Sequence, residues 1–290
     1  MEAVTDPYGW WIEPFVENPF MQRALVASLL VALVTAIVGT WVVLRGMAFF
    51  GDALAHGVLP GSAIAFILGV STAVGAFVAA AVVVAGVEVI RRGSPLPADT
   101  GIGVLFVGML ALAVVVMSTE QASYVGDLNR FLFGSITGVS ATDLWWQAAA
   151  VVLVLVVAAA LHRGFMVMPF DETLARMLGL RPRLLHVALL ALITVAIVSS
   201  FRIVGNLLVF AFLIAPPATS ALVVRRVPLI MVTAVVISAV AATTGILVSF
   251  HHDTAAGATM ALVSVAIFFV VLAGSAVRAR TPMGAKAALG

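Results

Sequence analysis

Asp52 and His56 place a carboxylate and an imidazole four residues apart in a stretch of the chain that is otherwise apolar. Residues i and i+4 share one face of a helix, so both side chains can point to the same spot. Nitrogen and oxygen donors of this kind bind divalent zinc or manganese. Ionisable groups inside a membrane are costly and by default indicate function. The spacing therefore predicts a position for a divalent metal ion in transit.

The composition is that of a membrane protein. The 290 residues are 63% hydrophobic and 10% charged, with a mean hydropathy of +1.21, whereas soluble domains are about 45–50% apolar and about 25% charged. There is no cysteine, which excludes disulfides and thiolate ligands. The formal charge of +2 does not indicate a nucleic-acid partner, because the basic residues lie between the apolar stretches.

The apolar stretches predict an all-α polytopic membrane protein with about nine transmembrane helices. Each stretch reaches or approaches the roughly 20 residues that a helix needs to cross a bilayer. Their all-round apolarity fits helices, whereas the strands of a membrane barrel would alternate. The expected spans are residues 24–44, 47–69, 72–90, 102–118, 144–161, 184–201, 203–223, 228–250 and 257–277.

Three parts are expected along the chain. Residues 1–20 form an interfacial N-terminal segment with Trp10 and Trp11 at headgroup depth. Its acidic start does not match a signal peptide. Residues 21–277 form the transmembrane domain, and residues 278–290 a cytoplasmic tail.

The distribution of basic residues predicts the orientation. If nine spans start outside, 12 of the 15 Lys and Arg residues lie inside, and only Arg23, Arg130 and Arg202 lie outside. Cytoplasmic loops carry the excess of positive charge. We therefore expect the N-terminus out and the C-terminus in.

Purely structural interpretations of the Asp52 region remain open. Asp52 could cap a helix that begins there, with His56 hydrogen-bonded to a neighbouring span. Depth argues against this, since a span beginning near Met47 puts His56 about 15 Å in, close to the bilayer centre. Pro60 cannot donate to the carbonyl of His56, which leaves either an extra oxygen ligand or a simple kink. Gly57 and Gly61 indicate close helix packing.

The inner loop 162–183 predicts a short amphipathic helix near residues 170–179. Asp171 is a candidate N-cap, Glu172 suits the first turn, and Gly179 a C-terminal stop. An apolar stripe follows the i, i+3, i+4 pattern and consists of Leu174, Met177 and Leu178.

A second polar cluster, His251, His252 and Asp253, lies at an outer helix end. Metal handling at the outer mouth and simple solvation are equally compatible with it. Adjacent histidines cannot share one helix face, so a chelate there requires irregular backbone.

Four motifs together resemble the zinc, manganese and iron permease family of ATP-binding-cassette importers. They are residues 39–61, 101–109, 131–134 and 170–179. The resemblance implies a homodimeric permease in the plasma (inner) membrane of a prokaryote. Its partners would be two cytoplasmic ATP-binding subunits and an extracytoplasmic metal-binding protein. It also implies that Asp52 and His56 line the metal path and that the 170–179 helix docks on the ATPase. The pair His251 and His252 departs from the family pattern.

No Walker A pattern occurs in the sequence, so we expect a transporter subunit with no nucleotide site and no cofactor of its own. Two copies would offer two carboxylates and two imidazoles, which favours zinc as the transported metal over manganese or iron. A different class stays open, a proton-coupled secondary transporter or channel in which Asp52 and His56 relay protons.

Overall fold

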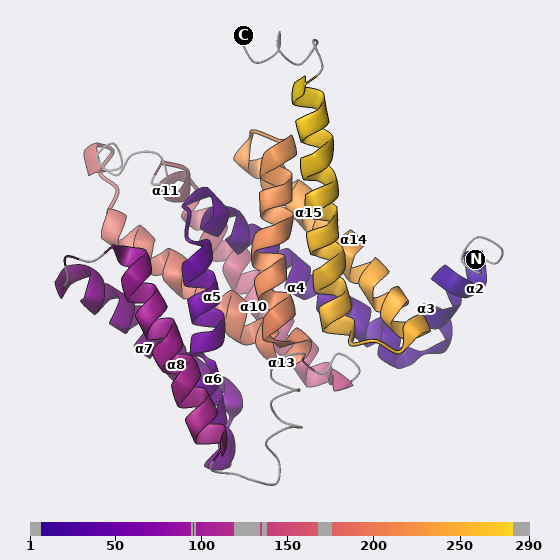
Figure 1. The fold of residues 1–290 in the computed structure, drawn as a ribbon, viewed down its shortest axis with the longest axis horizontal. Coiled ribbons are helices and arrows are strands. Elements are labelled where there is room, and N and C mark those ends of the chain that lie inside the picture. The colour runs from indigo at the N-terminus through magenta and orange to yellow at the C-terminus, as the bar shows by residue number, and fades with distance from the viewer. Residues whose placement is uncertain are drawn as a thin grey trace.

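The computed structural model describes residues 7–93, 95, 97–118, 134, 138–167 and 176–280. Within them each element with defined bounds is an α-helix, which confirms the all-α prediction (Figure 1). The helices are α2 (Pro7–Trp11), α3 (Glu13–Glu17), α4 (Pro19–Leu44), α5 (Ala48–Gly57), α6 (Leu59–Ile67), α7 (Thr72–Gly93), α8 (Ala98–Ser118), α10 (Ala141–Ala160), α11 (His162–Val167), α13 (Pro182–Val223), α14 (Val227–His252) and α15 (Ala256–Arg280).

Eight stretches in the described part of the chain are helical, apolar and long enough to cross a membrane. They match eight of the nine predicted spans, with α5 and α6 together forming the second. The predicted span 203–223 corresponds to the shorter apolar helix Leu208–Val223. At about 1.5 Å per residue this helix is about 24 Å long, less than the roughly 30 Å of a hydrocarbon core.

The helix α13 contains two of the predicted spans, 184–201 and 203–223. The break between them lies at Gly205, whose φ of 75° and ψ of 165° are not helical. Gly134, from the loop between α8 and α10, lies directly against this break. A Cβ on Gly134 would be 2.4 Å from both the Gly205 nitrogen and the Val204 carbonyl carbon. Both glycines have positive φ, which only glycine adopts without steric cost. Gly134 therefore packs on the turn that divides α13.

The two described ends of the chain lie at opposite ends of the bundle. The Trp10 and His251 rings stack with centroids 4.6 Å apart, so the N-terminal segment lies beside the end of α14. From there α15 runs away over its full length, about 37 Å at 1.5 Å per residue, as Figure 1 shows. Opposite ends require an odd number of crossings, and among the described residues Leu208–Val223 adds a ninth candidate to the eight longer helices. The assignment of one end to the cytoplasm stays a prediction, which rests on the distribution of the arginines.

Glycines set the closest helix crossings around α5 and α6. A Cβ on Gly57 would lie 2.6 Å from a methyl of Val83, and one on Gly61 would lie 2.2 Å from the Gly75 carbonyl oxygen. Both partners are on α7, so the packing predicted for Gly57 and Gly61 is confirmed. A Cβ on Gly39 of α4 would likewise lie 2.0 Å from the backbone oxygen of Leu213. These contacts fix the α5–α6 span between α7 and the α4–α13 core.

Candidate functional site

Asp52 and His56 meet on one face of α5. The His56 Nδ1 lies 3.2 Å from Asp52 Oδ1 and 3.2 Å from the Asp52 backbone oxygen. Both neighbours are acceptors, so Nδ1 carries the hydrogen and donates. The lone pair then resides on Nε2, which is the ring nitrogen available to a metal ion. Both side chains are about one-quarter exposed (24% and 26%), so the pair is reachable from outside the single chain.

The local helix structure excludes the capping interpretation of Asp52. α5 begins at Ala48 with Met47 as its N-cap, so Asp52 is one turn inside the helix. α5 ends at Gly57 and α6 begins at Leu59, with Pro60 in its first turn. Pro at this position is compatible with a new helix because the first-turn N–H groups have no intrahelical partner. His56 therefore lies next to a helix break, about 12 Å from the start of α5 at 1.5 Å per residue.

A groove of about 550 Å³ opens onto His56. Its walls come from the second half of α13, including Phe210 and Ile214, and from α15, including Ala258 and Leu262. His56 is the only titratable residue among those that line it. We call this space the His56 groove. Its α15 wall starts at Ala258, close to the beginning of that helix.

Phe106 packs against the His56 imidazole. Its ring meets the His56 ring edge-on, with centroids 5.4 Å apart and an interplanar angle of 88°. Phe106 also packs on Phe49, with centroids 6.4 Å apart. The aromatic contact restricts how far His56 can swing away from Asp52 and the groove. Phe106 belongs to the motif at residues 101–109, but the sequence alone gave it no role.

The groove walls are a second feature that sequence reasoning missed. They consist of ordinary apolar residues on two helices that are about 50 residues apart in the chain, such as Ala211 and Ala261. The paired prolines Pro216 and Pro217 inside α13 were the one local signal. They mark the helix, yet they do not say which face lines a cavity.

The predicted coupling segment is only partly described. Met177 and Leu178 are exposed apolar side chains (81% and 60%), and Gly179 adopts a φ of 73° with its N–H donating to the Arg176 carbonyl at 3.0 Å. This is the glycine stop that the sequence predicts. Asp171, Glu172 and Leu174 lie outside the described residues.

The predicted outer cluster is not drawn together. His251 Nε2 lies 3.1 Å from the Trp10 backbone oxygen, whereas His252 Nδ1 lies 3.1 Å from the Val248 oxygen of its own helix. Asp253 ends α14 in the left-handed region at φ 50°. Within the described ranges no three His, Asp or Glu side chains form a group that could hold a metal ion. A metal role for these three residues stays a prediction.

Comparison with known proteins agrees with this architecture. The ABC 3 transport family matches residues 17–275. The chain is 33% identical over 273 residues to a probable iron transport system membrane protein of Haemophilus influenzae, covering 94% of this chain and 100% of that one. It is 34% identical over 260 residues to the manganese transport system membrane protein MntC of Listeria monocytogenes, covering 90% and 92%.

A solved structure matches as well. PsaBC from Streptococcus pneumoniae, in complex with Fab, superposes with a TM-score of 0.82 at 30% identity, covering 90% of this chain and 94% of that one. The family match at residues 17–275 includes α5 with Asp52 and His56. This multi-pass membrane protein therefore belongs to the ABC 3 transport family.

Proposed function

We propose that divalent transition-metal ions cross the membrane past His56 and Asp52 of this chain. The chain is the permease subunit of an ATP-binding-cassette importer, and a separate subunit hydrolyses ATP. The observation that carries the proposal is that His56 lines an otherwise apolar groove while its Nδ1 lies 3.2 Å from Asp52 Oδ1. A lone polar pair at this depth is where a dehydrated cation would find its donors.

A second copy of the chain completes the ligand set in this proposal. One chain offers one imidazole nitrogen and one carboxylate, which is fewer than the four donors of a tetrahedral metal site. Two copies that meet at the His56 groove bring two of each. That set can hold a four-coordinate ion, or manganese with added waters. The exposed side chains of Leu262 (69%) and Val265 (36%) on the α15 wall support this contact, since a groove closed by a partner becomes a path.

In this proposal ATP hydrolysis in the partner subunits is coupled to transport through the segment that ends at Gly179. Five candidate spans separate Trp10 from the exposed side chains of Met177 and Leu178, so we place these side chains at the end of the bundle opposite Trp10 and His251. We assign them to the docking surface for the two ATP-binding subunits. The end that carries Trp10 and His251 would then receive the extracytoplasmic metal-binding protein. Alternating access follows when ATPase closure moves this segment and switches the side on which the path opens.

Manganese or iron is the cargo that the relatives favour. The relatives described above are named for iron and manganese, and the zinc preference expected from the donor set finds no support among them. Affinity rises from manganese through iron to copper and remains higher for zinc than for manganese at such sites. A transport site has to release its ion, and the weaker binding of manganese or iron suits release.

Uptake into proteoliposomes tests the proposal. The chain is reconstituted with its ATP-binding subunit and metal-binding protein, and uptake of radiolabelled manganese is followed with ATP, without ATP and with an acidic lumen. ATP-dependent uptake that is lost in Asp52→Ala and His56→Ala supports it. Uptake that needs a proton gradient and no ATPase would instead assign the pair to a proton relay in a secondary transporter.

A further inference from the structure

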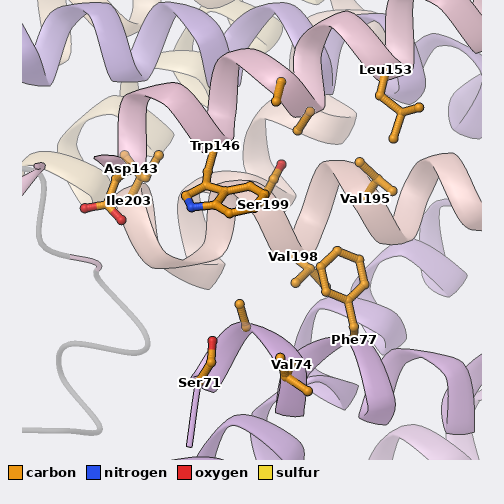
Figure 2. A pocket seen from close by; sticks show the side chains of 13 residues that line it. Ser71, Val74, Phe77, Asp143, Trp146, Leu153, Val195, Val198, Ser199 and Ile203 are labelled. Atoms are coloured by element: carbon orange, nitrogen blue, oxygen red, sulfur yellow. The ribbon is translucent and has the colours of Figure 1, made fainter. Parts of the chain in front are cut away.

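A second cavity, of about 480 Å³, lies between α7, α10 and the first half of α13, away from the His56 groove. Figure 2 shows its side chains. Four of them follow the i, i+3, i+4, i+7 pattern of one helix face on α10, namely Trp146, Ala149, Ala150 and Leu153. The opposite wall is formed by Val74 and Phe77 of α7 and by Val195 and Val198 of α13. We call it the lateral pocket.

Polarity in the lateral pocket changes from one end to the other. Asp143, Ser71 and the indole of Trp146 lie toward one end, whereas Leu153, Val195 and Phe77 lie toward the other (Figure 2). Ser199, between them, donates its hydroxyl to the Ala196 carbonyl of its own helix at 3.4 Å. The deep part of the pocket therefore presents hydrocarbon alone, and such a cavity excludes water.

The polar end coincides with the membrane boundary. Asp143 is the third residue of α10 and forms a capping box with Ser140, whose backbone and hydroxyl donate to the Asp143 carboxylate at 3.1 and 2.6 Å. Trp146 is 74% exposed, as expected of an indole at headgroup depth. From Asp143 to Leu153 the helix rises about 15 Å at 1.5 Å per residue. That is about half of a hydrocarbon core of roughly 30 Å, which is the depth of one lipid leaflet.

The surroundings of the pocket point to lipid. Exposed apolar side chains flank it on both walls, including Val78 of α7 and Val152 of α10. A surface of this composition faces acyl chains rather than water. The pocket is a recess in that surface, one leaflet deep, polar at the headgroup level and apolar below.

We propose that the lateral pocket binds one acyl chain of a membrane phospholipid, whose headgroup lies beside Asp143, Ser71 and Trp146. The chain fills the space between α7 and the α10–α13 pair, which otherwise leaves apolar atoms without packing partners. Ile203, two residues before the break at Gly205, lines the same end of the pocket as Asp143 (Figure 2), so the part of the lipid next to the headgroup contacts it. The bound lipid thereby becomes part of the packing around the turn in α13.

Native mass spectrometry of the chain, purified in detergent from membranes, tests this proposal. Ala149→Phe fills the pocket from an exposed position of α10, and Ala159→Phe makes the same change on the same helix at an exposed site outside the pocket. We expect the wild type and Ala159→Phe to retain one phospholipid per chain. Ala149→Phe should retain about tenfold less, since the ring removes the apolar surface that holds the acyl chain.

Val74→Trp fills the pocket from α7. It replaces Ala149→Phe as the test variant if thermal unfolding shows that Ala149→Phe does not fold. Equal retention by wild type and both pocket variants would show loosely surrounding lipid only and would overturn the proposal. So would a folded wild type that retains no phospholipid. Metal uptake is not the readout, so the result is independent of the function proposed for Asp52 and His56.

Discussion

The backbones of Gly61 and Gly75 touch where α6 crosses α7. A Cβ on Gly61 would lie 2.2 Å from the Gly75 carbonyl oxygen, and one on Gly75 would lie 2.1 Å from the Gly61 carbonyl oxygen. No side chain fits between two helices at this distance. Because α6 follows directly on the helix that carries His56, this crossing also sets where the imidazole lies.

Gly61→Ala should lower the thermal stability of the protein in detergent. The added methyl meets backbone rather than a flexible side chain, so α6 and α7 have to separate, at a cost of about 1–3 kcal/mol. Gly108→Ala is the matched control, because Gly108 is inside α8 with nothing within 4 Å of its Cβ position. There, alanine is the better helix former and should be neutral or stabilising. Equal unfolding temperatures for the two variants would contradict the close crossing.

Asp52→Ala and His56→Ala should each lower the initial rate of metal uptake at least about tenfold, in the range seen when a ligand or the residue that orients it is removed. Insertion and expression should be unchanged, because both side chains are about one-quarter exposed and the one that remains can be solvated. Thr233→Ala removes a hydroxyl that bonds only to its own helix, at the Leu229 carbonyl, and should keep full uptake. Near-normal uptake in a well-expressed Asp52→Ala, His56→Ala double variant would remove the pair from the path.

Local sequence patterns predicted the parts of the structure that depend on neighbours in the chain. The four-residue spacing of Asp52 and His56 placed both on one helix face, and Gly57 and Gly61 indicated close packing. The stop at Gly179 followed from helix-end chemistry in the same way. Each of these rests on helical periodicity alone.

Features built from distant segments could not be predicted in this way. The break at Gly205 depends on Gly134, which approaches from a different loop. The wall residue Leu262 of the His56 groove is indistinguishable by type from any lipid-facing leucine. The contact of His251 with Trp10 joins residues more than 200 positions apart in the chain. Apolar composition predicts that such residues lie in a membrane, but it does not predict which helix each of them contacts.

Replacing Met177 and Leu178 with Asp should uncouple the permease from its ATP-binding subunit. Both side chains are exposed and apolar, and burying two carboxylates in an apolar contact is costly without partners. Co-purification with the ATPase should fail. Gly93→Asp adds a carboxylate at an exposed position on the same predicted side, with nothing within 4 Å, and should leave the complex intact. If the double variant still binds and couples, another loop is the docking surface.

The purified chain alone should neither bind nor hydrolyse ATP. Its sequence has no Walker A pattern, so it lacks the loop whose backbone N–H groups cradle phosphates. Equilibrium dialysis with labelled ATP and a phosphate-release assay measure the two properties. The complex with the ATP-binding subunit is the positive control. Stoichiometric ATP binding by the isolated chain would contradict the division of labour between the subunits.

Manganese should be taken up, and zinc should inhibit that uptake. Two imidazoles and two carboxylates bind zinc more tightly than manganese in the Irving–Williams order. A tightly held ion leaves the site slowly, so zinc occupies the path while manganese passes. The measurement is radiolabelled manganese and zinc uptake into proteoliposomes, each titrated with the other metal unlabelled. In a control, the metal-binding protein is loaded beforehand with manganese or with zinc. This separates the selectivity of the binding protein from the selectivity of the permease. Zinc uptake at a rate equal to or above that of manganese would restore zinc as the cargo, while His56 and Asp52 would keep their place in the path.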